Sequence, residues 1–384
     1  MSNSINVEQT LAELVRFDSR SALSNREVIN YASARCESLG LRARLLPYTD
    51  DAGVEKFNLV AVAPHSTKET DEIELALVGH TDTVPFDPAW REALTLTERG
   101  GKLYGRGACD TKGFIAAALA AVAATDLTKL VRPLALVFTA DEEIGCLGAK
   151  QLSDARVMRV RNAVVGEPTS LQPMRAGKGY CLAEVLVRGR EGHSAYPALG
   201  ASAVMRAARL VTRIGEIAER LKTETHEAFD PPHTTLNVGI INGGTAKNII
   251  AGECRFTLEW RPVPGQHPER VVRLIRNEIE ELRAADAGFD CEINVIRLDG
   301  GIETPADSTL VRALEEATGR AAGSISFGTE APQMAELGAH AVVFGPGDIR
   351  VAHRTGEFVP VEELHACVSI LRGTIERFCA PEHQ

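Results

Sequence analysis

Apolar residues follow two different patterns in the first and last parts of the chain. Residues 7–17 and 26–38 have apolar positions three and four residues apart, which predicts amphipathic helices. Four later runs are apolar without polar alternation, as in strands buried on both faces of a mostly parallel sheet. These runs are 73–79, 134–139, 162–166 and 340–344. Segment 113–124 is small or apolar on most faces and is predicted to be a helix packed on that sheet.

The middle of the chain alternates apolar and polar residues instead, which predicts strands with one solvated face. Predicted strands and helices follow one another at 178–188, 202–221, 234–241, 254–260, 268–283 and 291–297. The order strand, helix, strand, strand, helix, strand is that of a ferredoxin-like fold. We therefore predict an α/β protein with a mostly parallel sheet, formed by residues 1–175 and 299–384. An α+β ferredoxin-like domain, residues 176–298, is inserted into it. A length of 384 residues agrees with two or three domains.

Composition excludes several classes of protein. The chain is 44% hydrophobic and 24% charged, as in ordinary globular proteins. Its formal net charge is −10 and it has no basic stripe, so nucleic acid and anionic membranes are not expected partners. Eight scattered cysteines without a C-x-x-C pair indicate reduced thiols. The N-terminus is polar and no apolar run reaches the length of a membrane span, so we expect a cytoplasmic protein.

Residues able to bind metals or protons stand at or just after the end of each of the four apolar runs. In chain order they are His80 and Asp82, then Asp141, Glu142 and Glu143, then Glu167, and finally His353. A further acidic residue, Asp110, lies in the glycine-containing loop 105–113. Because ligands bind beyond the carboxyl ends of parallel strands, we expect these side chains to converge at one edge of the sheet.

So many carboxylates in one place would repel one another unless a cation lay among them. Imidazole nitrogens with carboxylate oxygens suit zinc, cobalt or manganese. Two metals sharing one carboxylate are typical of peptidase-type sites. A single HTD or DEE sequence is more often a surface turn, and it is their repetition at successive strand ends that favours a metal site.

Five separated motifs, in this order, resemble the signature of the M20 metallopeptidase family over nearly the whole chain. They are GHTDTV at 79–84, the loop 105–113, TADEE at 139–143, GEPT at 166–169 and AH at 352–353. Longer stretches, among them VGHTDTVPFD, GEPTSLQPMRAGKG and FGPGDIRVAHRTGEFV, are similar to the branch of the family that acts on N2-acetyl-L-ornithine. The resemblance implies hydrolysis of that amide to L-ornithine and acetate, a step of arginine biosynthesis.

Other functions stay open beside this one. The same chemistry on another N-acyl amino acid, such as succinyl-diaminopimelate or an aminoacylase substrate, is the main alternative. A binding protein that shares the fold without catalysis is a second. A thiol hydrolase that uses Cys109, which stands next to Asp110, is a third.

The resemblance assigns five residues to two divalent metal ions, with zinc expected before cobalt or manganese. It implies that Asp110 bridges the two ions. His80 and Glu167 would complete one site, and Glu143 and His353 the other. It also implies a cis peptide bond after Asp110.

The resemblance assigns the remaining polar residues to the reaction and the substrate. Glu142 would be the general base that activates a water held by the metals. Asp82 would orient the neighbouring imidazole. The inserted domain would act as a lid and dimerisation domain. From it, His193 would stabilise the oxyanion in the partner subunit's active site, which requires a homodimer, and Asn248 and Arg261 would bind the substrate carboxylate.

Overall fold

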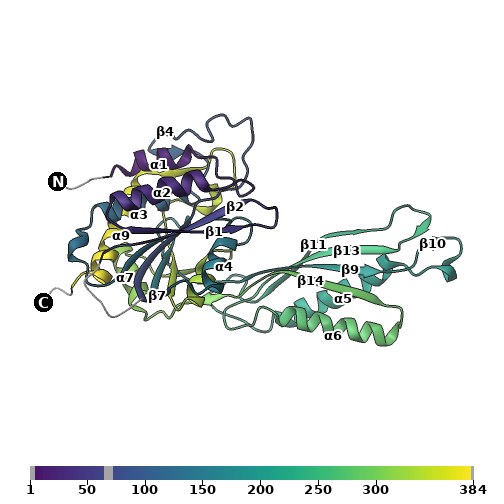
Figure 1. Cartoon of the computed structure of the whole chain (residues 1–384). Helices are drawn as coiled ribbons and strands as arrows, with labels where there is room; N and C mark the ends of the chain where they lie inside the picture. The colour runs from purple at the N-terminus through teal and green to yellow at the C-terminus, as the bar shows by residue number, and fades with distance from the viewer. Residues whose placement is uncertain (1–4, 65–71, 382–384) are drawn as a thin grey trace. The chain divides into compact units, whose positions relative to one another are not determined.

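The computed structural model describes residues 5–64 and 72–381 (Figure 1). The chain forms two compact units. Unit 1 comprises Met1–Arg175, Thr304–Gly323 and Thr329–Gln384, and unit 2 comprises Ala176–Glu303 and Ser324–Gly328. Unit 2 thus extends a few residues beyond the predicted domain, 176–298. That these residues form a domain that folds by itself stays a prediction. In the described part of the chain, no helix has both the length and the apolar character needed to cross a bilayer.

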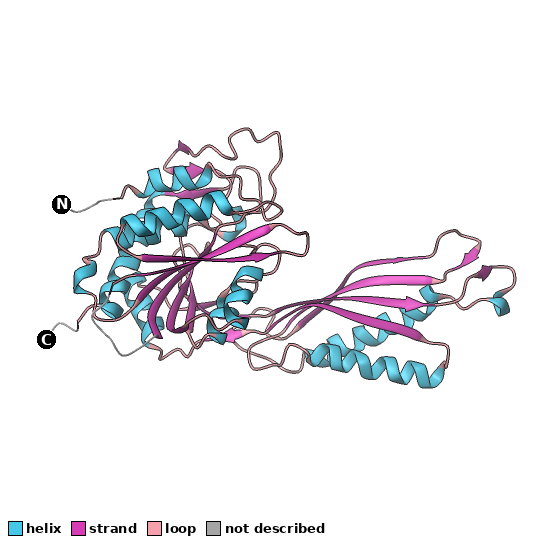
Figure 2. Cartoon of the chain, in the orientation of Figure 1, coloured by secondary structure: helices cyan, strands magenta, loops and turns pink. Residues whose placement is uncertain are grey.

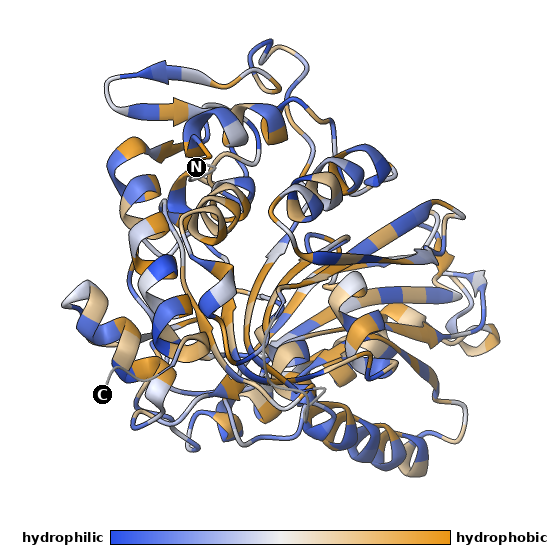
Figure 3. Ribbon diagram, turned by 60° about the vertical axis from the view of Figure 1, so that its left-hand side comes forward, coloured by the Kyte–Doolittle hydropathy of each residue, from blue (hydrophilic) through white to orange (hydrophobic). Residues whose placement is uncertain are grey.

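The centre of unit 1 is a mixed sheet whose four middle strands are parallel. They are, in spatial order, β6 (Leu134–Thr139), β3 (Glu72–His80), β7 (Arg159–Val165) and β17 (His340–Val343). These are the four apolar runs, and every residue of β6 is buried. Figure 3 shows the strands of this sheet largely in the hydrophobic colours. The prediction of an α/β fold with a mostly parallel sheet is therefore confirmed.

Further strands extend the sheet on both sides, and the strands next to β6 and β17 are antiparallel to them. Beyond β6 lie β2 (Glu55–Val62) and β1 (Arg42–Thr49), a hairpin that the apolar pattern did not reveal. Beyond β17, where the chain leaves and re-enters unit 1, lie the short strands β8 (Met174–Gly177), β15 (Ile302–Glu303) and β16 (Gly323–Ile325). A separate three-stranded sheet has the order β18 (Phe358–Pro360), β5 (Lys102–Tyr104), β4 (Thr97–Arg99).

Helices cover both faces of the larger sheet. The connections β3–α3–β6 and β6–α4–β7 run in opposite directions across it. Right-handed crossovers therefore place α3 (Lys112–Ala123) and α4 (Leu147–Asp154) on opposite faces. The other helices of unit 1 are α1 (Val7–Val15) and α9 (Val361–Cys379), which contact α3; α8 (Ala331–Glu336), which contacts α4; α7 (Thr309–Thr318), which contacts α9; and α2 (Arg26–Ser38), on β1 and β2. Short 3-10 helices lie at η1 (Leu127–Lys129) and η3 (Ile349–Val351).

Two glycines let α3 approach the ends of β3 and β7 closely. A Cβ atom on Gly166 would lie 2.2 Å from a ring carbon of Phe114, and one on Gly79 would lie 3.2 Å from Ile115 Cγ1. Both neighbours belong to α3. Each glycine directly precedes a candidate ligand, His80 or Glu167. The small residues therefore set how near the helix comes to the site.

Unit 2 has the predicted ferredoxin-like arrangement (Figure 2). Its elements follow in the order β9 (Tyr180–Arg188), α5 (Ala203–Leu221), β11 (Thr235–Gly243), β13 (Glu253–Arg261), α6 (Arg270–Ala285) and β14 (Asp290–Asp299). The sheet order is β11-β13-β9-β14, and every neighbouring pair is antiparallel. The apolar sides of α5 and α6 share one core with the sheet. A small extension holds β10 (Gly192–His193), η2 (Pro197–Leu199) and β12 (Ile249–Ile250).

Candidate metal centre

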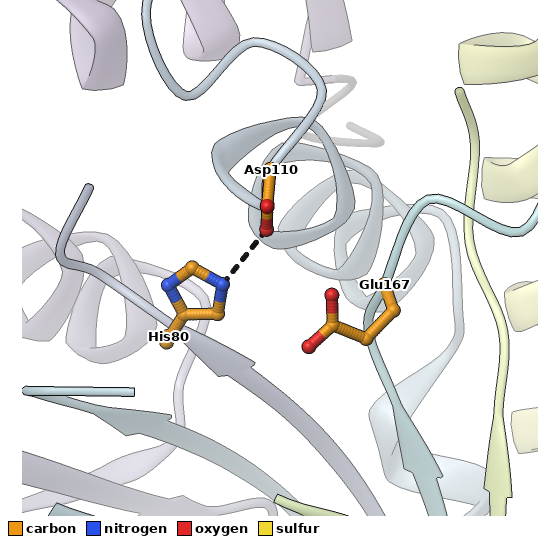
Figure 4. A group of neighbouring side chains, drawn as sticks. All are labelled: His80, Asp110 and Glu167. Carbon is orange, nitrogen blue, oxygen red and sulfur yellow. Dashed lines mark hydrogen bonds and ion pairs between the residues drawn. The ribbon is translucent and has the colours of Figure 1, made fainter. Parts of the chain in front are cut away.

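The parallel strand ends bring the five predicted ligands together around Asp110. Asp110 Oδ1 lies 3.0 Å from Nε2 of His80, and Oδ2 lies 3.0 Å from Nε2 of His353. His353 Nε2 is also 3.0 Å from Glu143 Oε2. Figure 4 shows the Glu167 carboxylate directed toward the same space as His80 and Asp110. Two groups of possible ligands result, His80–Asp110–Glu167 and Asp110–Glu143–His353, in which the ligand atoms all lie within 4.8 Å of one another.

The fold explains why these side chains meet. His80 is the last residue of β3, and Glu143 and Glu167 stand in the turns that follow β6 and β7. Asp110 lies in the loop before α3, and the peptide bond that follows it is cis. His353 follows η3 with a φ of 59°, and its side chain is 49% exposed. The site is thus closed on the side of the sheet and open beside His353.

The donors in each group fit a divalent cation. Each group offers one imidazole, one carboxylate of its own and a share of Asp110, which suits zinc, cobalt or manganese. Oε1 of Glu143 is buried and has no hydrogen-bond partner among the described residues. A buried oxygen without a partner costs free energy, and a cation at this position would satisfy it.

The pKa values of the metal-free site also favour binding of a cation. Burial raises the pKa of Glu167 well above its ordinary value, and the Asp110 and Glu142 carboxylates raise it further. Hydrogen bonds to Asp110 and Glu143 raise the pKa of His353 to about 10. Although burial opposes it, the two imidazoles hold the pKa of Asp110 below its usual range. With raised pKa values, Glu167 and His353 retain protons more readily in the metal-free site, and metal binding would release these protons.

Glu142 lies beside the two groups without belonging to either. Its Oε1 receives a weak hydrogen bond from the Cys146 thiol, with 3.4 Å between the sulfur and the oxygen. Burial raises the pKa of Glu142, and although His80 opposes the shift, the charges of Glu143 and Asp110 raise it further. A carboxylate with a raised pKa is suited to accept a proton and to give it up again.

Asp82 contacts His80 differently from the expectation. The nearer partner of His80 Nδ1 is the backbone oxygen of Asp82, at 3.0 Å, whereas its carboxylate Oδ1 is 3.6 Å away. That carboxylate accepts the Ser21 hydroxyl at 2.7 Å and the backbone N–H groups of Glu142 and Glu143 at 3.1 and 3.3 Å. Asp82 therefore fixes the turn that carries Glu142 and Glu143.

Two buried networks beneath the site were not found by sequence reasoning. Asp141, with a φ of 58°, binds Lys56 Nζ at 2.8 Å and the Tyr48 hydroxyl at 2.7 Å. Lys56 and Tyr48 come from the β1–β2 hairpin, whose sequence gives no sign of this contact. The second network joins Arg106 and Glu357. Its only signal in the sequence is an acidic residue four positions after His353.

The predicted residues of unit 2 lie in two places. His193 on β10 and Asn248 just before β12 are neighbours, because Ser194 N donates to the backbone oxygen of Asn248 at 3.1 Å. Arg261, at the end of β13, donates to Glu259 Oε1 and to the backbone oxygen of Ser326, both at 2.6 Å. The roles of these three residues stay predictions.

Cys109 is poorly suited to be a nucleophile. The thiol is buried, and its sulfur lies 3.7 Å from the backbone oxygen of Asp348. Burial and the nearby carboxylates of Glu357 and Asp110 raise the pKa of Cys109 well above its ordinary value. Since the thiolate is the reactive form, this environment disfavours the thiol hydrolase.

Comparisons with known proteins agree with the geometry. Residues 76–377 match the model of peptidase family M20/M25/M40. The chain is 56% identical over 371 residues to an acetylornithine deacetylase of Myxococcus xanthus, covering 96% of this chain and 97% of the relative. It is 35% identical to an acetylornithine deacetylase of Proteus mirabilis, covering 95% and 93%.

Solved structures support the fold. An M20 family metallo-carboxypeptidase from Sulfolobus solfataricus is similar with a TM-score of 0.76 at 20% identity, covering 97% of this chain and 99% of that one. A tripeptidase from Staphylococcus aureus is similar with a TM-score of 0.75 at 24% identity, covering 98% and 99%. At these identities the likeness concerns the fold.

Proposed function

The chain belongs to peptidase family M20/M25/M40, and from this premise we propose that it hydrolyses the acetyl amide of N2-acetyl-L-ornithine, giving L-ornithine and acetate. The observation that carries the proposal is the 56% identity to an acetylornithine deacetylase over nearly the full length of both chains. The donor groups around Asp110 supply the chemistry that such a reaction needs. The product would feed arginine biosynthesis.

We further propose that the two ligand groups hold two divalent metal ions, with Asp110 as the shared carboxylate. His80 and Glu167 would bind one ion, and Glu143 and His353 the other. Zinc is the first candidate, with cobalt and manganese as alternatives. When bound, such ions polarise a carbonyl group and lower the pKa of water.

We propose that Glu142 moves the proton. Its carboxylate would take a proton from the attacking water as the water oxygen bonds to the acetyl carbon. It would then give that proton to the ornithine nitrogen as the carbon–nitrogen bond breaks. The raised pKa of Glu142 supports both steps, and Asp82 holds the backbone of the turn in place.

Unit 2 would complete the site and join two subunits. We propose that His193 stabilises the oxyanion across a subunit boundary and that Asn248 and Arg261 bind the substrate carboxylate. Arg261 would have to exchange its contact with Glu259 for the substrate, which a bidentate guanidinium can do.

The edge of β11 supports the proposed homodimer. This strand contains no charged residue, and the side chains of Ile240 and Ile241 are 61% and 51% exposed. The opposite edge strand, β14, carries four charged residues. An uncharged, open edge strand favours pairing with another chain, and a second copy is the partner we propose. Eight free, buried cysteines are in keeping with a reduced cytoplasmic location, which stays a proposal.

A substrate panel with a metal measurement tests the function. Purified protein would be analysed for bound metal and assayed with N2-acetyl-L-ornithine, N-succinyl-diaminopimelate and N-acetylmethionine. We expect two ions per chain, fastest release of acetate from acetylornithine, and loss of activity after chelation. A clear preference for either other substrate would replace the substrate assignment, and turnover that survives complete metal removal would contradict the mechanism.

A further inference from the structure

Glu357 is fully buried, and its carboxylate belongs to neither candidate ligand group. Its Oε1 accepts the backbone N–H groups of Cys109 and Asp110, at 3.0 and 3.1 Å. Its Oε2 accepts Arg106 Nη1 at 2.5 Å. The carboxylate of Glu357 therefore binds the main chain at Asp110, whose side chain belongs to both candidate ligand groups.

Strand pairing fixes the position of Glu357. β18 begins at the next residue and pairs with β5, with Phe358 opposite Tyr104. Gly105 N donates to the backbone oxygen of Glu357 at 3.1 Å. The loop that starts at Gly105 and carries Asp110 is thus joined to the Glu357 segment by both main chain and side chain.

The same segment also supplies a candidate ligand. His353 stands four residues before Glu357, and its Nε2 lies 3.0 Å from Asp110 Oδ2. Residues 353–357 therefore contact Asp110 at two points, its side chain through His353 and its main chain through Glu357. Both contacts limit where the Asp110 carboxylate can lie.

The ion pair between Arg106 and Glu357 should contribute little to the free energy of unfolding. Arg106 is buried, and its Nη2 donates to the backbone oxygen of Pro85 at 3.3 Å. Its Nε, however, is buried without a hydrogen-bond partner among the described residues. A buried ion pair with an unsatisfied donor adds little net stability, since desolvation offsets the attraction. Its main consequence is then the geometry it imposes on Glu357.

We propose that Glu357, held by Arg106, is a positioning residue for the shared carboxylate Asp110, so that both metal positions depend on it. This inference rests on the proposed two-metal function and deepens it. The network of Lys56, Tyr48 and Asp141 should affect only one metal position. The turn that it supports carries Glu143, which belongs to only one of the two ligand groups. Loss of Glu357 should therefore weaken both metal positions together.

Metal titration tests this without an activity assay. Metal-free wild-type protein, Glu357→Gln and Glu363→Gln would each be titrated with Zn²⁺ in competition with a chromophoric chelator. Glu363 is the matched control, since its Oε2 accepts the backbone N–H of Gly347, at 2.8 Å, in a different loop. We expect both dissociation constants of Glu357→Gln to rise about 10- to 100-fold, as for other residues that support metal ligands. Those of Glu363→Gln should stay at the wild-type values.

The outcomes separate this inference from the proposed function. Wild-type constants in a folded Glu357→Gln protein, or a change in only one constant, would overturn the positioning role. If circular dichroism shows Glu357→Gln to be unfolded, Glu357→Asp replaces it. This variant keeps the charge but withdraws the carboxylate from the two N–H groups, so it carries the same expectation and the same refutation. A wild-type protein that binds fewer than two ions would overturn the proposed function and this inference with it.

Discussion

The large sheet of unit 1 and the four-stranded sheet of unit 2 distribute polar residues in opposite ways. In unit 1 the four parallel strands are covered by helices on both faces, and their carboxyl ends all meet at one edge. In unit 2 every neighbouring pair is antiparallel, so successive strands end at opposite edges, and one face carries both helices. Donors placed at strand ends are therefore gathered in unit 1 and dispersed in unit 2. Topology, more than composition, decides where the carboxylates of this acidic chain collect.

The largest effect should come from removing Glu142, the proposed general base at the carboxyl ends of the parallel strands. Glu142→Gln keeps the shape of the side chain and should lower kcat by about 10²- to 10⁴-fold, because the attacking water loses its proton acceptor. Bound metal should stay at two ions, since Glu142 belongs to neither ligand group. Steady-state kinetics with metal analysis would check both. Glu98→Gln, an exposed site on β4, is the control, and undiminished turnover in Glu142→Gln would place the base elsewhere.

The next largest effect concerns the open edge of unit 2. The double variant Ile240→Lys, Ile241→Lys should weaken subunit association by about 2 kcal/mol or more, because charge at the centre of an interface is costly. Ile296→Lys on β14, where the side chain is 53% exposed, should leave association unchanged. Sedimentation at several protein concentrations would measure this. Equal weakening by the β14 variant would argue against β11 as the interface.

A pair of glycine variants compares packing in the two units. Gly166→Ala should destabilise the protein by about 1–3 kcal/mol, because the new methyl group meets the Phe114 ring. Gly215→Ala, within α5 and with open space around it, should stabilise by about 0.5–1 kcal/mol. Urea denaturation followed by circular dichroism gives both values. A neutral Gly166→Ala would mean that α3 can move away from the strand ends.

The smallest effect is a pH dependence of the metal-free protein. The pKa of His353, raised to about 10, exceeds the unfolded value of about 6.5, so the native state holds the extra proton. This contribution is complete below about pH 6.5 and is lost as the pH rises through about 10. Burial also raises the pKa of Glu167, so this group likewise makes the metal-free protein less stable as the pH rises. Half-exposure of His353 screens the effect.

Melting midpoints between about pH 6 and 9 would check this sign. They should fall with pH in the metal-free protein. The stabilisation gained from saturating Zn²⁺ should grow over the same range, because the metal displaces protons. A metal-free midpoint that rises with pH would contradict the protonation described for the site.

The sequence predicted the central strands well, because strands buried on both faces show as uninterrupted apolar runs. β6 was found at its observed bounds, 134–139, and β17 within one residue. The β1–β2 hairpin was missed, since β1 is only partly buried and its pattern is irregular. In the site, residues next to strand ends could be inferred from parallel topology.

Supporting residues could not be inferred in this way. Lys56 contacts Asp141, which is 85 positions away in the sequence. Glu357 contacts Cys109 and Asp110, which are 248 and 247 positions away. No local period records such contacts. Asp82 shows a finer limit: its spacing from His80 suggested a carboxylate–imidazole contact, whereas the backbone oxygen is the nearer partner. Spacing brings a residue near the site, and only the path of the main chain decides which of its atoms arrives there.

The insertion of unit 2 has a consequence for the order in which the site is made. His80, Asp110, Glu143 and Glu167 precede residues 176–303, whereas His353 and β17 follow them. A ribosome adding about 5–20 residues per second therefore releases four donors well before the fifth. β17 also pairs with β7 inside the larger sheet, so the strand ends cannot be fully aligned until it arrives. The complete donor set first exists when synthesis is nearly finished, so the proposed two-metal site can be filled only after nearly the whole chain has been made.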